Sequence, residues 1–289
     1  MQSRRSLTIA IWGAVTALVV ATAGAAAWLK LRAEQEAMAD TEDRVQRFVS
    51  GAEAALNRTL IDVDLLLAGM DDLLAPDGVF ERSSAERTLR GIVKRKLEFR
   101  DLAVIDADGR VLASAREQTE RLGLALPERF AQDTLAQPRP MLAMSAPVNN
   151  RANAERAIYF ARPVSLGPAR RVLVVAEVPV SILATILAQS VQIPGLVVTL
   201  ERDDGQLLTS VPASDAQLGQ VLATPLPAPA LSGKPVRAAG RLDGSASILA
   251  ARPSLYRSLR ISAGISEDAA LGGWRHDRQV VFGAAAAFV

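Results

Sequence analysis

The sequence contains no cysteine and a single histidine, His276. The absence of thiols excludes disulfides, a thiolate nucleophile and metal sites built on sulfur. One imidazole close to an apolar C-terminus provides neither a metal cluster nor a histidine-containing dyad with a clear partner. A glycine-rich phosphate loop is also missing, since Gly272-Gly273 stands alone. We therefore predict no catalytic residue, no metal site and no cofactor, and we expect that this chain is not an enzyme.

Aromatic residues make up only 4% of the chain, so the core must be filled mainly by Leu, Val, Ile and Ala. The 33 basic and 31 acidic side chains nearly cancel. Basic residues are mostly scattered singly, and their densest run, residues 87–100, also carries Glu98. A nucleic-acid-binding surface needs clustered Lys and Arg. We interpret this run as a solvated helix face and expect no nucleic-acid partner.

Near the N-terminus, Leu7–Leu29 form 23 positions without a charged residue. As a helix this segment is roughly 34 Å long, enough to cross a hydrocarbon core of about 30 Å. Trp12 and Trp28 lie near its ends, where indole rings favour the membrane interface. A cleaved signal peptide is the alternative, since residues 23–25 are small, but the apolar stretch is longer than such peptides carry. We predict a retained anchor, with residues 1–32 as a cytoplasmic tip and first transmembrane helix.

The last ten residues, 280–289, are entirely apolar, and residues 274–278 before them suit a membrane interface. Ten helical residues span roughly 15 Å, about half a bilayer. A buried terminal helix or a frayed tail would also fit this pattern. We expect instead that residues 273–289 are a juxtamembrane helix and the start of a truncated second transmembrane helix. Two membrane helices would place residues of about 30–278 on one side, which we expect to be the periplasm, with the chain in a bacterial inner membrane.

Between these ends, residues 33–74 have the pattern of one long helix, in which apolar residues recur at three- and four-residue steps. The apolar positions are Val45, Phe48, Val49, Ala52, Leu56, Leu60, Val63, Leu67, Met70 and Leu74. Pro76-Asp77-Gly78 ends this helix. The stripe fits either a coiled-coil seam against a second copy or a face packed on a domain. Both can also hold, each for a different half of the helix. A second helix is predicted from Ser84 to Phe99, with Ser84 as its cap.

An internal repeat is the most informative feature of the chain. LAVIDADGRVLAS begins at Leu102 and VTLERDDGQLLTS begins at Val198. The Asp-Gly pair and a later Leu-Gly pair recur at one constant offset, and the Ala-Arg-Pro of residues 161–163 recurs at residues 251–253. Because the matches come in the same order, the sequence predicts two units of one fold.

Apolar runs flank each Asp-Gly pair, which predicts a β-hairpin with a type I′ turn and positive φ at both central positions. Asp106 and Asp108 are interpreted as turn residues, because no further acidic positions of a calcium loop follow. Further strands are predicted over 141–148, 157–164, 171–178, 236–242, 247–253 and 259–265, with a helix over 180–189. The predicted fold class is α+β, with a long helix and a membrane-distal antiparallel-sheet unit in residues 33–190 and a membrane-proximal unit in residues 191–272.

These features resemble the double Cache sensor domains of bacterial transmembrane receptors, which are tandem PAS-like extracytoplasmic domains. The resemblance rests on LAVIDADGRVLAS, on the strand pair AIYFARPV and RVLVVAEVPV, and on RISAGISEDAALGGWR before the last apolar run. It implies a small ligand held between the sheet and the loops of the membrane-distal unit. The family's amino-acid-binding members carry a cluster of Tyr, Arg, Trp and Tyr before the third strand. Residues 116–139 contain neither Trp nor Tyr, which argues against an amino-acid ligand.

Four residues are the candidate ligand contacts of this unit: Tyr159, Ser145, Met141 and Arg162. Tyr159 alternates with two alanines, which leaves room for a ligand on its face of the strand. Ser145 and Met141 are expected to border the same cavity. Arg162 points to the opposite face, and its recurrence as Arg252 argues for a structural role in both units. Simple packing of Tyr159 in the core is the alternative.

We therefore expect the ligand-sensing input region of a bacterial inner-membrane signal-transduction receptor for a small metabolite. A homodimer joined along the N-terminal helix would let small displacements register across the membrane. A diguanylate cyclase is the favoured cytoplasmic output outside this chain, and a histidine kinase or a chemotaxis signalling domain is the alternative. A membrane-anchored binding protein without any output is the rival from another class.

Overall fold

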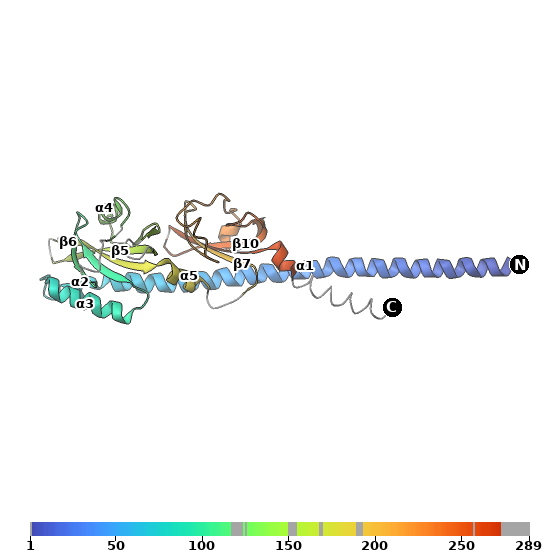
Figure 1. Cartoon of the computed structure of the whole chain (residues 1–289), viewed down its shortest axis with the longest axis horizontal. Helices are drawn as coiled ribbons and strands as arrows, with labels where there is room; N and C mark the ends of the chain where they lie inside the picture. Colours follow the sequence, from blue (N-terminus) through green and yellow to red (C-terminus); the bar gives the residue numbers. More distant parts are fainter. Residues whose placement is uncertain are drawn as a thin grey trace.

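The structure is a computed structural model, and it describes residues 2–116, 124, 126–149, 155–167, 170–188, 193–256 and 258–272. In the first helix, side chains are described from residue 20 onward, except at positions 22, 23 and 26. Figure 1 shows two sheet-containing units lying one after the other along a single long helix. The distal unit lies at the end of this helix away from the N-terminus, and the proximal unit lies between it and the N-terminus.

The long helix, α1 (Gln2–Ala68), carries the predicted apolar stripe, and every residue of that stripe is buried. Gly69 interrupts the helix, and α2 (Met70–Leu74) continues it for a short distance. The chain then leaves the helix through Gly78, whose φ is +71° and whose N–H donates to the carbonyl oxygen of Ala75 at 2.9 Å. The long helix and its end are confirmed, and the stripe packs on the two units.

The distal unit contains an antiparallel sheet with the strand order β2-β1-β6-β5-β3, and β4 also pairs with β5. Its strands are β1 (Asp101–Ile105), β2 (Val111–Ser114), β3 (Ala143–Met144), β4 (Val148–Asn149), β5 (Arg156–Leu166) and β6 (Arg170–Pro179). Helices α1 and α3 (Arg82–Arg95) pack on the inner face of this sheet, and α4 (Phe130–Leu135) packs on the outer face. The cap predicted at Ser84 was wrong, because α3 already begins at Arg82 after Glu81.

The proximal unit repeats this sheet, with the strand order β8-β7-β11-β10-β9. Its elements are β7 (Leu196–Arg202), β8 (Leu207–Val211), the short 3-10 helix η2 (Ala230–Ser232), β9 (Val236–Ala239), β10 (Ala246–Pro253) and β11 (Leu259–Ser266). Each strand takes the place of its counterpart in the distal order: the hairpin lies at one edge and the last strand lies beside the first. The predicted repeat and the α+β class are confirmed.

Both Asp-Gly hairpins form, but their turns differ from the predicted type. Only the glycine of each pair has positive φ, +78° at Gly109 and +88° at Gly205. In the first turn, the Asp106 carboxylate accepts the N–H groups of Asp108 and Arg110, at 3.0 and 2.8 Å. A bulge shifts the strand register beside each turn. The type I′ prediction was wrong, because the carboxylate stabilises a longer loop that needs only one left-handed residue.

The strand predicted over 141–148 is broken into β3 and β4. Between them, the N–H of Ser145 donates to the carbonyl oxygen of Tyr159, and the N–H of Tyr159 donates to Ser145 Oγ, both at 2.9 Å. Pro147 follows and has no N–H to offer to the ladder. The side chain of Ser145 therefore takes over one position of the ladder, and regular pairing stops there.

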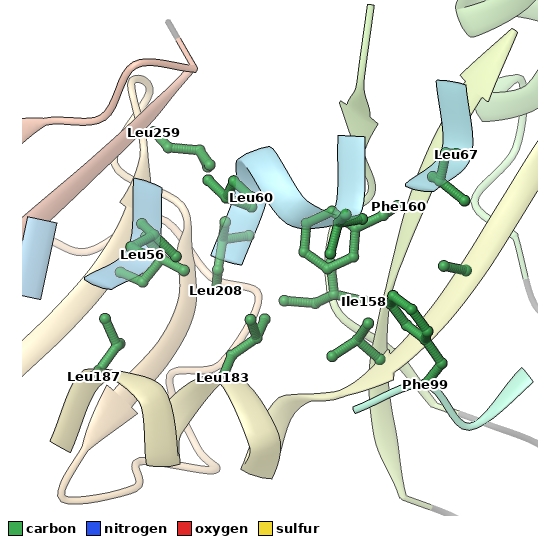
Figure 2. Close-up of a cluster of buried hydrophobic side chains, with 14 of the residues drawn as sticks. Leu56, Leu60, Leu67, Phe99, Ile158, Phe160, Leu183, Leu187, Leu208 and Leu259 are labelled. Carbon is green, nitrogen blue, oxygen red and sulfur yellow. The ribbon is translucent and has the colours of Figure 1, made fainter. Parts of the chain in front are cut away.

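One hydrophobic core runs along α1 through both units (Figure 2). It is formed by Leu56 and Leu60 of α1, Ile158 and Phe160 of β5, Leu208 and Leu259 of the proximal strands, and Leu183 and Leu187 of α5 (Val180–Ala188). Helix α5 leads from the distal to the proximal sheet and buries its leucines beside α1. Because the units share one core, we expect them to unfold together.

Two equivalent arginines attach the two sheets to α1. Arg162 of β5 forms an ion pair with Asp64. Arg252, its counterpart on β10, lies 2.7 Å from Glu53 Oε2 and also donates to Ser50 Oγ at 2.9 Å. Asp64 and Glu53 are about three helical turns apart on α1, so they project from the same side of the helix. The structural role inferred from the recurrence of this arginine is confirmed.

Tyr256 joins the proximal unit to the same point on α1. Its hydroxyl lies 3.2 Å from Asp64 Oδ2 and 3.3 Å from the carbonyl oxygen of Leu60. Burial, reinforced by the nearby charge of Asp64, raises the pKa of Tyr256 to about 12 from its ordinary value of 10.0. Asp64 therefore holds Arg162 of the distal unit and Tyr256 of the proximal unit at once.

This raised pKa predicts a loss of stability at high pH. Because the folded state holds the Tyr256 proton more tightly than the unfolded state, the contribution is complete below pH 10.0 and falls as the pH approaches about 12. Urea unfolding at a series of pH values should show a steeper alkaline decline in the wild type than in Tyr256→Phe, which has no phenol to titrate. Parallel declines in the two proteins would contradict the role given to this hydroxyl.

The predicted membrane segments are not tested by the described residues. Residues 7–29 lie within α1, but most of their side chains are outside the described set, and residues 273–289 are outside it altogether. Among the residues that the structure does describe, no helix has both the length and the apolar character needed to cross a membrane. The division between residues 190 and 191 also falls outside the described residues. The anchors, that boundary, the inner-membrane location and the homodimer stay predictions.

Candidate ligand-binding site

The outer face of the distal sheet carries a second apolar cluster, separate from the core along α1. Its buried members are Ile105, Tyr159, Ala161, Leu173 and Val175. They come from β1, β5 and β6, the three central strands of the sheet. Phe130 and Leu135 of α4 pack against this cluster, together with Leu124 and Leu126. A short helix and loop residues therefore cover the outer face, whereas the long helix covers the inner face.

Two acidic side chains share this face with Tyr159. Asp101 of β1 is the register partner of Glu177 of β6, and Glu177 is the register partner of Tyr159 of β5. Residues directly opposite in antiparallel strands point to one face, with Cβ atoms about 4.5–5.5 Å apart. Asp101, Glu177 and Tyr159 are 2%, 5% and 1% exposed. We call these three residues the acidic row.

Hydrogen bonds and an arginine hold the two carboxylates of the row. Ser114 Oγ lies 3.2 and 3.4 Å from the two carboxylate oxygens of Asp101, and the N–H of Arg116 lies 3.3 Å from Oδ1. Arg100 Nη1 lies 3.6 Å from Glu177 Oε1. Arg100 also pairs with Glu155, which directly precedes β5.

The row places two carboxylates, one of them paired with Arg100, beside a mostly apolar wall. Adjacent carboxylates repel each other. Within the described ranges, no three His, Cys, Asp or Glu side chains gather as a metal site would require. Two carboxylates beside an aromatic ring are groups that can interact with a cation.

The structure brings together two of the four predicted ligand contacts. Tyr159 lies on the outer face, and the fully buried Ser145 beside it directs its hydroxyl into the strand ladder, where it accepts the Tyr159 N–H. Met141 is 55% exposed and lines a different cavity of about 490 Å³, which Arg202 of the proximal unit also borders. Arg162 lies on the inner face in its ion pair with Asp64.

The sequence interpretation missed Asp101 and Glu177, although one of them left a signal. Glu177 interrupts the apolar run RVLVVAEVPV, and strand alternation puts it on the face of Leu173 and Val175. An acidic residue inside a buried strand needs a partner, so it marks a candidate site. Asp101 gave no such signal, because it begins its strand directly after Arg100 and reads as a solvated residue.

Known proteins match this chain in structure. No protein-family model and no curated protein matches it. The extracellular domain of a protein described as a histidine kinase superposes with a TM-score of 0.66 at 18% identity, over 82% of this chain and 99% of that one. The ligand-binding domain of the Pseudomonas fluorescens chemoreceptor CtaA, in complex with L-isoleucine, gives 0.63 at 15% identity, over 82% and 97%. That of the Pseudomonas aeruginosa amino acid chemoreceptor PctB, in complex with L-Gln, gives 0.57 at 16% identity, over 86% and 99%.

These likenesses cover nearly the full length of the matched domains, so they include the long helix and both sheets. At identities below a fifth, they show the fold. The chain therefore has the double Cache-like fold of extracytoplasmic sensor domains, as the sequence resemblance predicted.

Proposed function

We propose that this chain is the extracytoplasmic ligand-sensing input region of a membrane receptor and that its ligand binds on the outer face of the distal unit. The acidic row carries the proposal, because it places buried charge on a sheet face that is otherwise lined by apolar side chains. The similar solved structures support it, since they are extracellular or ligand-binding domains and two of those named above hold amino acids.

The ligand in this proposal is a small molecule with a cationic amine. An ammonium group beside Asp101 and Glu177 adds a positive charge to that of Arg100 and offsets the repulsion between the two carboxylates. Tyr159 adds an aromatic ring next to the charge. The Tyr, Arg, Trp and Tyr cluster of the resembled amino-acid-binding domains is missing from residues 116–139. A simple amine therefore fits this chain better than an α-amino acid.

The signal in this proposal passes from the distal sheet to α1 through the contact between Arg162 and Asp64, and through the proximal unit toward the C-terminal segment. A ligand moves such an equilibrium only through its different affinities for two states, about 1.4 kcal/mol for each tenfold difference. A homodimer along the N-terminal part of α1 and a diguanylate cyclase output complete the proposal. A histidine kinase or chemotaxis output is the alternative, and an anchored binding protein without output is the rival.

The amine proposal is tested by thermal denaturation of the chain with methylamine, ethanolamine, putrescine, choline, L-alanine, acetate and succinate. A ligand at a hundred times its dissociation constant stabilises the folded state by about 2.7 kcal/mol. We expect at least one amine to raise the melting temperature and neither organic acid to do so. Glu177→Gln keeps the shape of the side chain but removes its charge, so it should weaken binding of that amine at least tenfold.

Glu86→Gln is the matched control. Glu86 belongs to an exposed ion pair with Arg82 on α3, which packs on the inner face of the distal sheet. Its replacement should leave the amine shift unchanged. Stabilisation by acetate or succinate alone, or an amine shift that survives Glu177→Gln, would refute the acidic row as the ligand site.

A further inference from the structure

The proximal unit has its own cavity at the place that corresponds to the acidic row. Val197 of β7 is the register partner of Gly264 of β11, and Gly264 is the register partner of Leu249 of β10. These three take the positions of Asp101, Glu177 and Tyr159 in the repeat. All three line a cavity of about 230 Å³ on the outer face of the proximal sheet.

The cavity exists because a glycine occupies the central position. A Cβ atom at Gly264 would lie 3.2 Å from Leu249 Cβ, which is a tight contact. With no side chain there, the middle of the sheet face stays open between Val197 and Leu249. The rest of the wall is polar, with Arg241, Ser247 and Ser266 among its residues.

Arg241 is the buried anchor of this wall. Its Nε and Nη2 both donate to Glu201, with Nε 2.9 Å from Oε1 and Nη2 2.5 Å from Oε2, and the two side chains are 5% and 1% exposed. Nη1 is buried, and it has no hydrogen-bond partner among the residues that the structure describes. A buried guanidinium N–H without an acceptor is costly, so this nitrogen needs an acceptor that the chain's described part does not provide.

Hydroxyl groups complete the polar lining. Ser247 Oγ donates to the carbonyl oxygen of Ser245, and Ser266 Oγ accepts the N–H of Ala269. Asp243 accepts the N–H and the hydroxyl of Ser245, and these bonds lower its pKa from 3.8. The wall therefore presents donors and acceptors side by side.

The charges of the wall select against ionic ligands. Glu201 neutralises Arg241 through two hydrogen bonds, so the guanidinium has no charge left to balance an anion. Asp243 at the mouth is exposed and repels anions further, while its hydrogen bonds to Ser245 already stabilise its negative charge. An uncharged molecule with several hydroxyl groups uses the donors and the acceptors without leaving a buried charge unbalanced.

We propose that this proximal cavity is a second ligand site, independent of the distal one, and that it binds a small uncharged polyol. One hydroxyl oxygen of the polyol accepts a hydrogen bond from Arg241 Nη1, and the others contact Ser247, Ser266 and Asp243. The site adjoins the start of the C-terminal segment, because Ser266 and Gly195 both line it and Gly195 packs against Ala269. A ligand bound here lies at the end of the unit from which the chain leaves the sheet.

Saturation-transfer NMR on the full chain tests this site, with glycerol, erythritol and D-xylose as polyols and with acetate and methylammonium as charged probes. We expect transfer to at least one polyol and not to acetate, and any transfer to methylammonium should persist in Val197→Phe because it arises at the distal site. Val197→Phe fills the cavity by packing over Gly264, so it should abolish the polyol signal. Arg241→Lys keeps a positive charge for Glu201 but removes Nη1, so it should weaken polyol binding about tenfold.

Val79→Phe is the matched control for Val197→Phe, because Val79 is 72% exposed in the distal unit. It should bind the polyol as the wild type does. Transfer to acetate in place of the polyols, or a methylammonium signal that Val197→Phe abolishes, would overturn the charge argument. Transfer to no polyol would mean that water alone satisfies Arg241, and this would overturn the proposal whether or not amines bind the distal unit.

Discussion

Arg241→Met is expected to destabilise the folded chain by about 3–5 kcal/mol, because it leaves Glu201 buried without its counter-charge. Glu201 is almost fully buried and receives two hydrogen bonds from this one guanidinium. Thr199 also donates to Glu201 and shares a hydrogen bond of 2.6 Å with Ser262, so two further polar side chains lie beside the pair. Urea unfolding measures the loss directly.

The double variant Glu201→Gln with Arg241→Met distinguishes two costs. One is the loss of the ion pair itself, and the other is the burial of Glu201 without a counter-charge. Removing both charges should recover much of the stability, since a buried ion pair contributes little beyond its apolar replacement. Arg252→Met is the matched control at the repeated arginine, whose ion pair with Glu53 is far more exposed. It should cost no more than about 1 kcal/mol. Equal losses for Arg241→Met and Arg252→Met would contradict the difference in burial.

Leu60→Ala is expected to cost about 2–5 kcal/mol and to shift a single unfolding transition. Leu60 is fully buried on α1 and belongs to the core that both units share (Figure 2). A cavity at this position removes contacts from the distal and the proximal side at once. Thermal unfolding, followed both by far-ultraviolet circular dichroism and by calorimetry, should therefore show both units losing stability together.

Leu65→Ala is the matched control on the same helix, because Leu65 is 67% exposed. It should change the free energy of unfolding by no more than about 0.5 kcal/mol. Two separate transitions, only one of which responds to Leu60→Ala, would show that the units fold independently and that the shared core contributes little.

Much of the fold could be predicted because it repeats. The stripe on α1, the two hairpins and the strands after them follow from period and order, and these signals accumulate over many residues. The failures were local. The sequence gives no direct sign that Asp106 prefers a longer turn, or that Ser145 replaces a backbone group in the ladder with its side chain. Both depend on one side chain competing with the backbone for a hydrogen bond.

The site was harder to predict than the fold because it depends on register. Tyr159 stood out by its alanine neighbours, and its face of the sheet is where the acidic row lies. That Glu177 lies beside Tyr159, and Asp101 beside Glu177, follows only from the pairing of β1, β6 and β5. Strand pairing between residues so far apart in sequence leaves no local pattern. Arg241 was missed for the same reason, since its partner Glu201 lies 40 residues earlier in the sequence, on β7.

The two arginine contacts on α1 also restrict how that helix can move. One turn to either side of Asp64 lie Leu60 and Ala68, and one turn to either side of Glu53 lie Val49 and Asn57. A slip of α1 along its axis by one turn, about 5.4 Å, would therefore take both guanidiniums away from any carboxylate at the same moment. The two contacts therefore fix the position of α1 along its own axis relative to both sheets. Under the proposed function, any motion that α1 transmits must therefore be one in which both sheets move with it, such as a tilt or a bend of the whole helix.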